Sequence, residues 1–575
     1  MKVPPCTSSV LTVLLCAAAL LPFAAFAPAQ DPLQVLNNQI PPEVSNGQAA
    51  LVQSLPADHL LYFSIVLPLR NQPVLKNLLQ RLYNPSDPDY RNFLTVDQFT
   101  EQFGPTVDDY NAVVSFVQAN GFTVTGAPAN RLIVPVSGTA AQIEKAFNVK
   151  MNVYQHPTEN RLFFSPDRDP SLYLGVSIKG ISGLSNFSVP RPALARPALG
   201  GGGSSPSGGP GSGPYGSYLP SDMRAAYYGS GPLTGSGQCV GLAEFGGYGI
   251  GDVVSTFNGY ATETPSGSNY ILTYTPPAGG GPYNIQITNL PQNSANIGTY
   301  NGDEIEVVLD IAQAIGMAPG LSQVRVYFAP DAWTVVGNDE FPSSNDDTVI
   351  LNQMAADAPP YGAGCYQLSI SWNWRPENPL NDQDEGVFEE LQLQGQGFFN
   401  ASGDYGSWTT NSACSYGSCF VYPEESPNVI AVGGTDLTTS GPGGSWISES
   451  GWSNSGGGIS PDLFPIPSYQ SGLGGINGTS TVYRNAPDVA MEANTDNYFC
   501  YFGSCSPNPS CTTLDISCAE GGTSFAAPRW AGFTALVNQQ AAANSSPAIG
   551  FLNPYIYPIG EGPNYLTDFN EVVGG

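Results

Sequence analysis

Histidine is nearly missing from this chain of 575 residues. His59 and His156 are the only two, and both lie in the first third of the sequence. All five lysines precede residue 180. From residue 216 onward no imidazole or amine side chain is available as a base, and tyrosine and arginine are too basic at ordinary pH. Acid–base chemistry in that part of the chain therefore falls to carboxyl groups.

Positive charge is scarce as well. The formal net charge is −29 although only 11% of the residues are charged, and from residue 216 onward five arginines face 34 aspartates and glutamates. Nucleic acid is excluded as a partner, because phosphate binding needs basic patches. This part repels itself at neutral pH, and the repulsion fades at pH 3–4 as carboxylates are protonated. The composition therefore suits an acidic medium.

A long apolar run is present only at the start of the chain. "MKVPPCTSSVLTVLLCAAALLPFAAFAPAQ" has a lysine, an apolar run and an Ala-x-Ala end, and predicts a signal peptide over residues 1–29, cut after Ala27 or Ala29. A membrane anchor is the alternative, and Pro22 and Pro28 weigh against it. No later run is long enough to span a bilayer. We expect a secreted, extracellular monomer without a membrane anchor.

Cysteine is absent from residues 30–215, and eight cysteines follow between Cys239 and Cys518. In an exported chain, eight cysteines indicate disulfides, with 105 conceivable pairings. The short loops 414–419, 500–505 and 511–518 are the local candidates. A metal cluster is the alternative, and the lack of a neighbouring histidine disfavours it.

The chain divides into two units around a linker. Residues 30–188 predict a small α+β domain, with helices over 74–84, 108–121 and 139–148 and a strand over 131–138. Residues 189–217 are rich in Gly, Ser and Pro, and form either a spacer or a cleavage zone. Residues 218–575 alternate strands with helices, which predicts a parallel α/β sheet covered on both faces.

A candidate nucleophile lies near the end of the chain. In "EGGTSFAAPRWAG", Ser524 and Pro528 resemble the nucleophile turn of a subtilisin-like serine peptidase, in which the serine begins a helix. A serine hydroxyl needs a neighbouring base. Glu306 and Asp310, four residues apart on a predicted helix, project from one face and can share one proton. The alternative is an ordinary solvated pair on a surface helix.

A candidate oxyanion donor lies between these motifs. The turn in "QGFFNASGDYGS" presents Asp404, which would donate a hydrogen bond to an oxyanion if it were protonated. The alternative is an aspartate that merely caps a turn.

Together these residues resemble the sedolisin family of serine-carboxyl peptidases, in particular its kumamolisin-like members. "DPDYRNFLTVDQFTEQFGP" and "NRLIVPVSGTAAQIEKAFNV" are similar to the activation propeptide of that family, and "SYLPSDMRAAYYG" to the start of the mature enzyme. "EVVLDI", "SGD" and "GGTSFAAP" fit its catalytic motifs. The resemblance implies a ferredoxin-like α+β propeptide over 30–188 and a subtilisin-like α/β catalytic domain over 218–575.

The resemblance also implies the role of each site residue. Ser524 would be the nucleophile, Glu306 the general base, Asp310 its partner and Asp404 the oxyanion acid. Kumamolisin-like members connect the dyad to an outer glutamate and a tryptophan, and Glu244 and Trp372 occupy those places. Gly521 stands where the family often has a serine.

Calcium is implied by the same resemblance. Family members bind one ion near the C-terminus through an aspartate, the next carbonyl and further oxygens, and Asp568 and the Phe569 carbonyl match the first two. The sequence ends at Gly575 before the remaining ligands, so the expected ligand set is incomplete. Calcium takes about 6–8 oxygens.

The leading expectation is a secreted acid endopeptidase, made as a zymogen that processes itself between about residues 188 and 218. Its substrates would be proteins or peptides, its propeptide would be an intramolecular inhibitor and folding aid, and acid is expected to weaken propeptide docking. The alternatives are a tripeptidyl-peptidase of the same family, an inactive peptidase-like binding protein and a cell-surface structural protein. A histidine-dependent subtilisin requires a histidine in the mature part, which has none.

Overall fold

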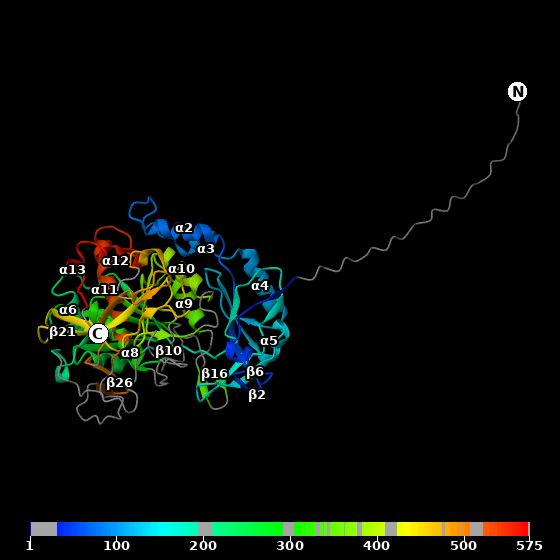
Figure 1. The fold of residues 1–575 in the computed structure, drawn as a ribbon, viewed down its shortest axis with the longest axis horizontal. Helices are drawn as coiled ribbons and strands as arrows, with labels where there is room; N and C mark the ends of the chain where they lie inside the picture. The colour runs from blue at the N-terminus through cyan, green and yellow to red at the C-terminus, as the bar shows by residue number, and fades with distance from the viewer. Residues whose placement is uncertain are drawn as a thin grey trace.

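The structure is a computed structural model. It describes residues 1, 32–193, 210–290, 304–328, 334–336, 339–341, 346–360, 363–375, 382–408, 422–473, 478–494, 496–506 and 521–572. The predicted signal peptide, apart from Met1, and the loops 414–419 and 511–518 lie outside the described residues. Figure 1 shows a smaller unit, blue to cyan, beside a larger unit that runs from green to red.

The smaller unit has the predicted ferredoxin-like arrangement. Its core sheet has the order β4-β5-β3-β9 with antiparallel neighbours, and its helices follow the first and third of these strands in sequence. The elements are β3 (Leu60–Val66), α4 (Val107–Ala119), β4 (Thr123–Val124), β5 (Ile133–Thr139), α5 (Ala140–Phe147) and β9 (Gly180–Ser182). Thr139 caps α5 as predicted, accepting a hydrogen bond from the Gln142 backbone.

The other elements of this unit surround that sheet or reach the larger unit. They are β1 (Leu33–Val35), α1 (Pro42–Ser45), β2 (Ala50–Ser54), α2 (Gln72–Leu82), α3 (Val96–Gln102), β6 (Met151–Gln155), β7 (Leu162–Pro166) and β8 (Ser171–Tyr173). Leu75 and Leu82 of α2 and Phe99 of α3 belong to the hydrophobic core of the larger unit. The segment 72–103 therefore docks the first unit onto the second.

The larger unit is built on a long sheet whose central neighbours are parallel, as predicted. In spatial order, the strands are β12 (Ala261–Ser266), β13 (Asn269–Tyr274), β14 (Tyr283–Leu290), β15 (Gln323–Phe328), β11 (Cys239–Glu244), β18 (Gln367–Ile370), β20 (Gly397–Ala401), β21 (Ile430–Thr439) and β22 (Trp446–Gly451). β25 (Val489–Glu492) also pairs with β21.

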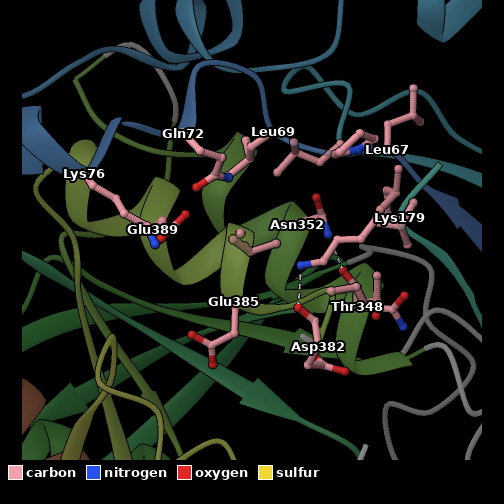
Figure 2. Close-up of a pocket in the computed structure, with 17 residues that line it drawn as sticks. Leu67, Leu69, Gln72, Lys76, Lys179, Thr348, Asn352, Asp382, Glu385 and Glu389 are labelled. Carbon is pink, nitrogen blue, oxygen red and sulfur yellow. Dashed lines mark hydrogen bonds between the residues drawn. The ribbon is translucent and has the colours of Figure 1, made fainter. Parts of the chain in front are cut away.

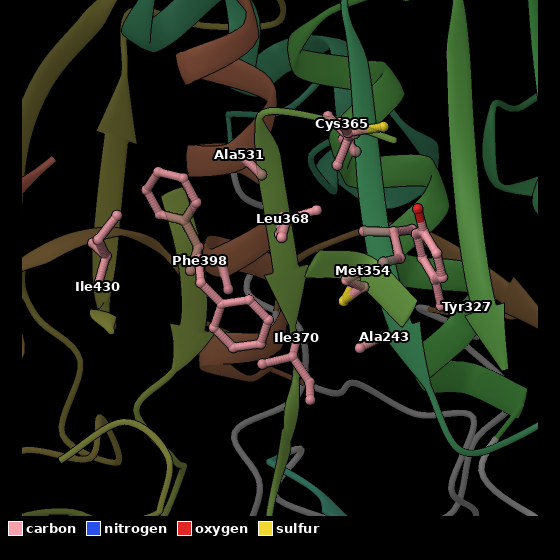
Figure 3. Packing of buried hydrophobic residues seen from close by; sticks show 14 of the residues in the cluster. Ala243, Tyr327, Met354, Cys365, Leu368, Ile370, Phe398, Ile430 and Ala531 are labelled. Atoms are coloured by element: carbon pink, nitrogen blue, oxygen red, sulfur yellow. The ribbon is translucent and has the colours of Figure 1, made fainter. Parts of the chain in front are cut away.

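Helices cover both faces of this sheet. On one face α8 (Glu304–Met317) packs against α11 (Thr523–Ala543), and a Cβ at Gly532 would lie 2.8 Å from the Ala314 carbonyl, so a glycine permits the close crossing. On the other face α9 (Asp346–Ala356) packs against α10 (Glu385–Leu393). Figure 3 shows Met354 of α9 gathered with Leu368 and Ile370 of β18.

Smaller elements complete the larger unit and the connection into it. They are β10 (Arg191–Pro192), η1 (Pro214–Gly216), α6 (Pro220–Tyr227), α7 (Ile250–Thr256), β16 (Thr334–Val336), β17 (Asp339–Phe341), β19 (Trp372–Asn373), β23 (Gly458–Ile459), η3 (Ser468–Gln470), β24 (Asn485–Ala486), β26 (Phe499–Tyr501), β27 (Ser504–Ser506), α12 (Asn553–Gly560) and α13 (Tyr565–Asp568).

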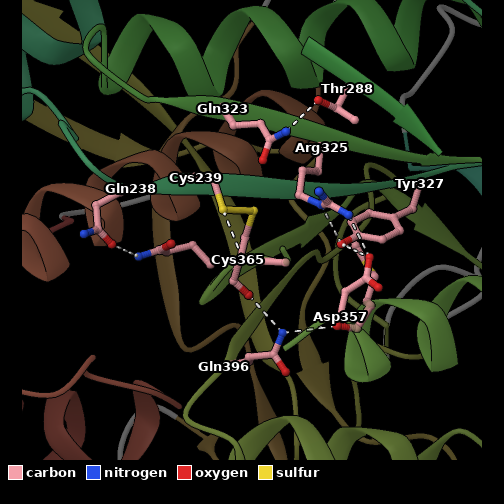
Figure 4. Close-up of a disulfide and its surroundings, with 12 residues drawn as sticks. Gln238, Cys239, Thr288, Gln323, Arg325, Tyr327, Asp357, Cys365 and Gln396 are labelled. Atoms are coloured by element: carbon pink, nitrogen blue, oxygen red, sulfur yellow. Dashed lines mark hydrogen bonds and ion pairs between the residues drawn. A yellow bond between two sulfur atoms is a disulfide. The ribbon is translucent and has the colours of Figure 1, made fainter. Parts of the chain in front are cut away.

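Two disulfides join described cysteines. Cys239 at the start of β11 bonds to Cys365 before β18 (Figure 4), and Cys500 bonds to Cys505 across β26 and β27. The predicted loop 500–505 is confirmed, and these four cysteines are not ligands of a metal cluster. Among the described residues, no helix is long and apolar enough to cross a membrane.

Candidate active site

The predicted carboxyl pair lies inside the protein. Glu306 and Asp310 on α8 are both 0% exposed, because the sheet, α11 and neighbouring helices enclose α8 on all sides. They are therefore not a solvated pair on a surface helix. A buried carboxylate is costly unless it is paired or protonated, so this environment favours a shared proton.

The beginnings of α8 and α11 meet at this place. Ile305 and Leu309 of α8 form one apolar cluster with Phe525, the residue after Ser524. Ser524 is the second residue of α11 and is buried, and its hydroxyl has no hydrogen-bond partner in the described part of the chain. The fold thus places the nucleophile candidate at the same end of the helix pair as the two carboxyls.

Ser371 connects the carboxyl pair to the nucleophile turn. Its hydroxyl donates to Asp310 Oδ1 at 2.8 Å and lies 3.4 Å from the carbonyl oxygen of Ser524. Ser371 follows β18 directly, so the end of a parallel strand sets its position. The sequence analysis missed this residue, because a single serine after a strand carries no distinguishing pattern.

Glu244 and Trp372 extend the carboxyl network outward, where the resemblance had put them. Trp372 Nε1 donates to Glu244 Oε2 at 2.9 Å, and the charge of Glu244 acts on Asp310. Burial raises the pKa of Glu244. Burial and then the charges of Glu244 and Glu306 raise the pKa of Asp310 well above its usual value. This network therefore retains protons to a higher pH than free carboxyl groups do.

Asp404 lies against the turn with Ser524, after the end of β20, the parallel neighbour of β18. It is 2% exposed, and its Oδ1 accepts hydrogen bonds from the main-chain nitrogen of Thr523 at 2.7 Å and from Thr523 Oγ1 at 2.9 Å. Thr523 directly precedes Ser524, and its Oγ1 also accepts a bond from the Gly403 main chain at 3.1 Å. Thr523 was missed in the sequence analysis as well, although it belongs to the quoted motif.

A strand that follows the first unit lies along this site. β10 pairs with β19 in antiparallel register, and the Ala193 main chain donates to the Ser371 carbonyl at 2.8 Å. β10 lies at the start of the predicted linker, whose residues 194–209 are outside the described part. The next segment docks again, since Ser212 donates to the buried Asp222 side chain. The first unit thus places an extended peptide beside Ser371 and Trp372.

The predicted calcium ligands do not form a site here. Asp568 is an exposed residue at the end of α13, and Phe569 follows it. Within the described ranges, no three His, Cys, Asp or Glu side chains lie close enough to hold a metal ion. One carboxylate and one carbonyl do not fit a shell of about 6–8 oxygens.

The sequence matches known families in both units. Residues 48–187 match the family described as "Pro-kumamolisin, activation domain", and residues 347–549 match the "Subtilase family". The second range contains Asp404 and Ser524.

Several characterised relatives align along most of the chain. Xanthomonalisin of Xanthomonas sp. (strain T-22) is 29% identical over 87% of this chain, which spans 60% of that protein's length. Sedolisin of Pseudomonas sp. (strain 101) is 27% identical over 79% of this chain and 73% of its own length. Kumamolisin of Bacillus sp. (strain MN-32) is 28% identical over 84% of this chain and 80% of its own length. The chain is therefore similar to sedolisin-type peptidases along most of its length, and combines a match to the pro-kumamolisin activation domain with a match to the subtilase family.

Proposed function

We propose that this chain is a secreted, acid-acting endopeptidase that is made as a self-processing zymogen. The observation that carries the proposal is the Ser371 hydroxyl, which lies between Asp310 and the main chain of Ser524 and so joins a buried carboxyl network to a serine at a helix start. No histidine follows residue 156, so this network is the available source of a base.

In the proposed mechanism, Glu306 accepts the proton of Ser524 as its oxygen attacks the peptide carbonyl. Asp404 in its protonated form donates a hydrogen bond to the oxyanion, a contribution worth roughly 2.7–4 kcal/mol for one such donor. Glu306 then gives the proton to the leaving amine. Water hydrolyses the acyl-enzyme on Ser524, with Glu306 again acting as the base.

Asp310 is proposed to hold the second proton of the pair. Its burial and the neighbouring Glu244 and Glu306 charges favour its neutral form, which leaves Glu306 as the ionised member. Glu306 must be ionised while Asp404 is protonated. With ordinary carboxyl pKa values near 4, both conditions hold together below about pH 5. The rate is therefore expected to follow a bell with its maximum in acid.

The zymogen proposal is supported by β10. Because this strand pairs with β19 and its continuation bonds to Ser371, the first unit lies where an extended substrate would bind. We expect one intramolecular cut within about residues 188–218. Extended segments of proteins or peptides are the substrate class that fits the edge of β19 with which β10 pairs.

The decisive experiment compares the purified precursor with Ser524→Ala and Glu306→Gln at pH 4 and pH 7. Wild type is expected to generate a new N-terminus between residues 188 and 218 at pH 4 only, as read by mass spectrometry. Ser524→Ala is expected to stay intact. Glu306→Gln keeps the shape and removes the base, and is expected to cost at least a factor of about a hundred.

Glu304→Gln is the matched control. Glu304 is also a buried carboxyl on α8, but its Oε1 accepts a hydrogen bond from the Gly249 main chain, which a glutamine oxygen retains. Normal processing in Ser524→Ala, near-normal activity in Glu306→Gln or a wild-type optimum at pH 7–8 would each contradict the proposal. The cut sites in a denatured protein substrate distinguish an endopeptidase from a tripeptidyl-peptidase, because the latter would release successive three-residue fragments. If no substrate is cleaved at all, the chain is an inactive binding protein.

A further inference from the structure

Ser371 is a fully buried residue that none of the proposed chemical steps uses. Its hydroxyl has one proton to donate, and the acceptor 2.8 Å away is Asp310 Oδ1. The Ser371 hydroxyl oxygen also lies 3.4 Å from the carbonyl oxygen of Ser524. The main-chain carbonyl of Ser371 accepts a hydrogen bond from the Ala193 main-chain nitrogen. One residue thus contacts a carboxyl of the pair, the nucleophile turn and the peptide strand bound beside them.

We infer that Ser371 is a positioning residue, which holds Asp310 in the orientation that lets it keep the second proton. The inference rests on the proposed function of the Glu306–Asp310 pair. With Oδ1 accepting from Ser371, the proton that Asp310 carries is confined to its other oxygen. The bond from Ser371 thus fixes the orientation of the Asp310 carboxyl plane.

A buried serine in or next to β18 does not need a hydrogen bond to a carboxyl group. Ser369 lies two residues earlier on the same face, since side chains in a strand alternate between faces. It is also 0% exposed, and its hydroxyl has no hydrogen-bond partner in the described part of the chain. The bond from Ser371 to Asp310 is therefore a specific feature of this position, and Ser369 provides a matched control.

The test measures kcat and KM of the mature enzyme on one peptide substrate at its pH optimum. Ser371→Ala is expected to lower kcat about tenfold to a hundredfold with KM nearly unchanged, which is the effect of losing one hydrogen bond to a carboxyl group. Ser369→Ala is expected to keep wild-type kcat. Ser371→Thr retains the hydroxyl and is expected to recover most of the loss. Melting temperatures identify the folded variants.

A double-mutant cycle separates positioning from packing. In an Asp310→Asn background, Ser371→Ala is expected to cost less than about threefold, because its partner is already altered. Equal costs in both backgrounds would overturn the inference, as would a rise in KM with kcat unchanged. A folded Ser371→Thr that is as slow as Ser371→Ala would overturn it too. If Asp310→Asn and Ser524→Ala themselves retain full activity, the proposed function fails, which is a different result.

Discussion

The main-chain nitrogen of Thr523 donates to Asp404 Oδ1 at 2.7 Å, and the Thr523 hydroxyl donates to the same oxygen at 2.9 Å. One oxygen of Asp404 is thus engaged by the residue before Ser524. The arrangement joins the proposed oxyanion acid to the turn that carries the proposed nucleophile. The two hydrogen bonds also determine how the amide group of an Asp404→Asn variant would be oriented.

Asp404→Asn is expected to keep most of the activity and to extend it toward neutral pH. The amide oxygen can take the place of Oδ1 and accept both bonds from Thr523, which leaves the NH₂ group as a donor at every pH. The loss at the acid optimum should stay below about tenfold, whereas Asp404→Ala removes the donor and should cost about a hundredfold or more. The measurement is the pH dependence of kcat/KM. An unchanged alkaline limb in Asp404→Asn would exclude Asp404 as the group that sets it.

The stability of the protein is expected to fall as pH rises above about 4.5. Burial raises the pKa of Glu390 to about 8, so the native state binds a proton that the unfolded state has lost above an ordinary pKa near 4.3. A group whose native pKa is raised stabilises the fold below its unfolded pKa, and this contribution is lost as pH rises through the native value. For Glu390 alone the loss amounts to roughly 3 kcal/mol between pH 4.5 and 7.

Thermal unfolding of the Ser524→Ala variant between pH 4 and pH 8 tests whether stability falls as pH rises. The substitution prevents self-digestion during the measurement. Glu425→Gln is the informative variant. Burial and the hydrogen bond with Asp462 raise the pKa of Glu425, and its Oε2 accepts from Ser460 at 2.6 Å. A glutamine mimics the protonated acid, so the decline with pH should flatten. Glu263→Gln, at an exposed position of β12, should follow wild type. A melting temperature that rises from pH 4.5 to pH 7 would contradict this account.

Part of this organisation was predictable from local patterns. The spacing of Glu306 and Asp310, the turn with Asp404 and the motif around Ser524 are each contiguous in sequence, and the alternation of strands and helices predicted the parallel sheet. The burial of the whole of α8, Glu304 included, could not be predicted from this spacing, because it depends on the elements that enclose the helix. Ser371 and Thr523 acquire their roles only where strand ends meet helix starts, and this depends on packing between distant segments.

A chelator is expected to leave the melting temperature unchanged. Asp568 is exposed and forms no group with two other His, Cys, Asp or Glu side chains among the described residues, so loss of calcium should remove no native-state binding energy. The measurement is the melting temperature with excess EDTA, with excess calcium, and for Asp568→Asn. A drop with EDTA that calcium reverses, and that Asp568→Asn abolishes, would show that calcium is bound and that Asp568 is one of its ligands.

The contact surface between the two units bears on how acid acts on the zymogen. Lys179 binds the main-chain carbonyl of Asp382, and Tyr83 donates to the carbonyl of Gln392 at 2.8 Å. These acceptors keep their hydrogen bonds at every pH. Lys179, Lys76 and Gln72 of the first unit line a cavity of about 380 Å³ together with Glu385 and Glu389 of α10. Figure 2 shows Lys76 beside Glu389 and Lys179 beside Asp382. The expectation that acid weakens docking through lost ion pairs therefore does not apply to the two hydrogen bonds of Lys179 and Tyr83.

The carboxyl groups that line this cavity predict that acid strengthens the docking of the two units. Burial raises the pKa of Glu385 to about 7 and also raises that of Glu389, while Lys76 and Lys179 lower the latter. If release of the first unit exposes these groups to water, their pKa values fall toward the ordinary value, so the docked state binds more protons. Docking is therefore expected to strengthen as pH falls from 7 to 4, and the cut between the units, rather than acid itself, would release the propeptide.

The uncut Ser524→Ala precursor tests this last expectation. Hydrogen exchange in α2 and α10, which lie on the two sides of the cavity, should be slower at pH 4 than at pH 7 after correction for the intrinsic rate. Glu389→Gln removes one titrating group and should reduce the difference, whereas Glu263→Gln on exposed β12 should not. Exchange in α2 that becomes faster in acid, with the chain still intact, would mean that protonation alone loosens the propeptide. In that case maturation would begin with acid-driven opening, and the chemistry at Ser524 would follow it.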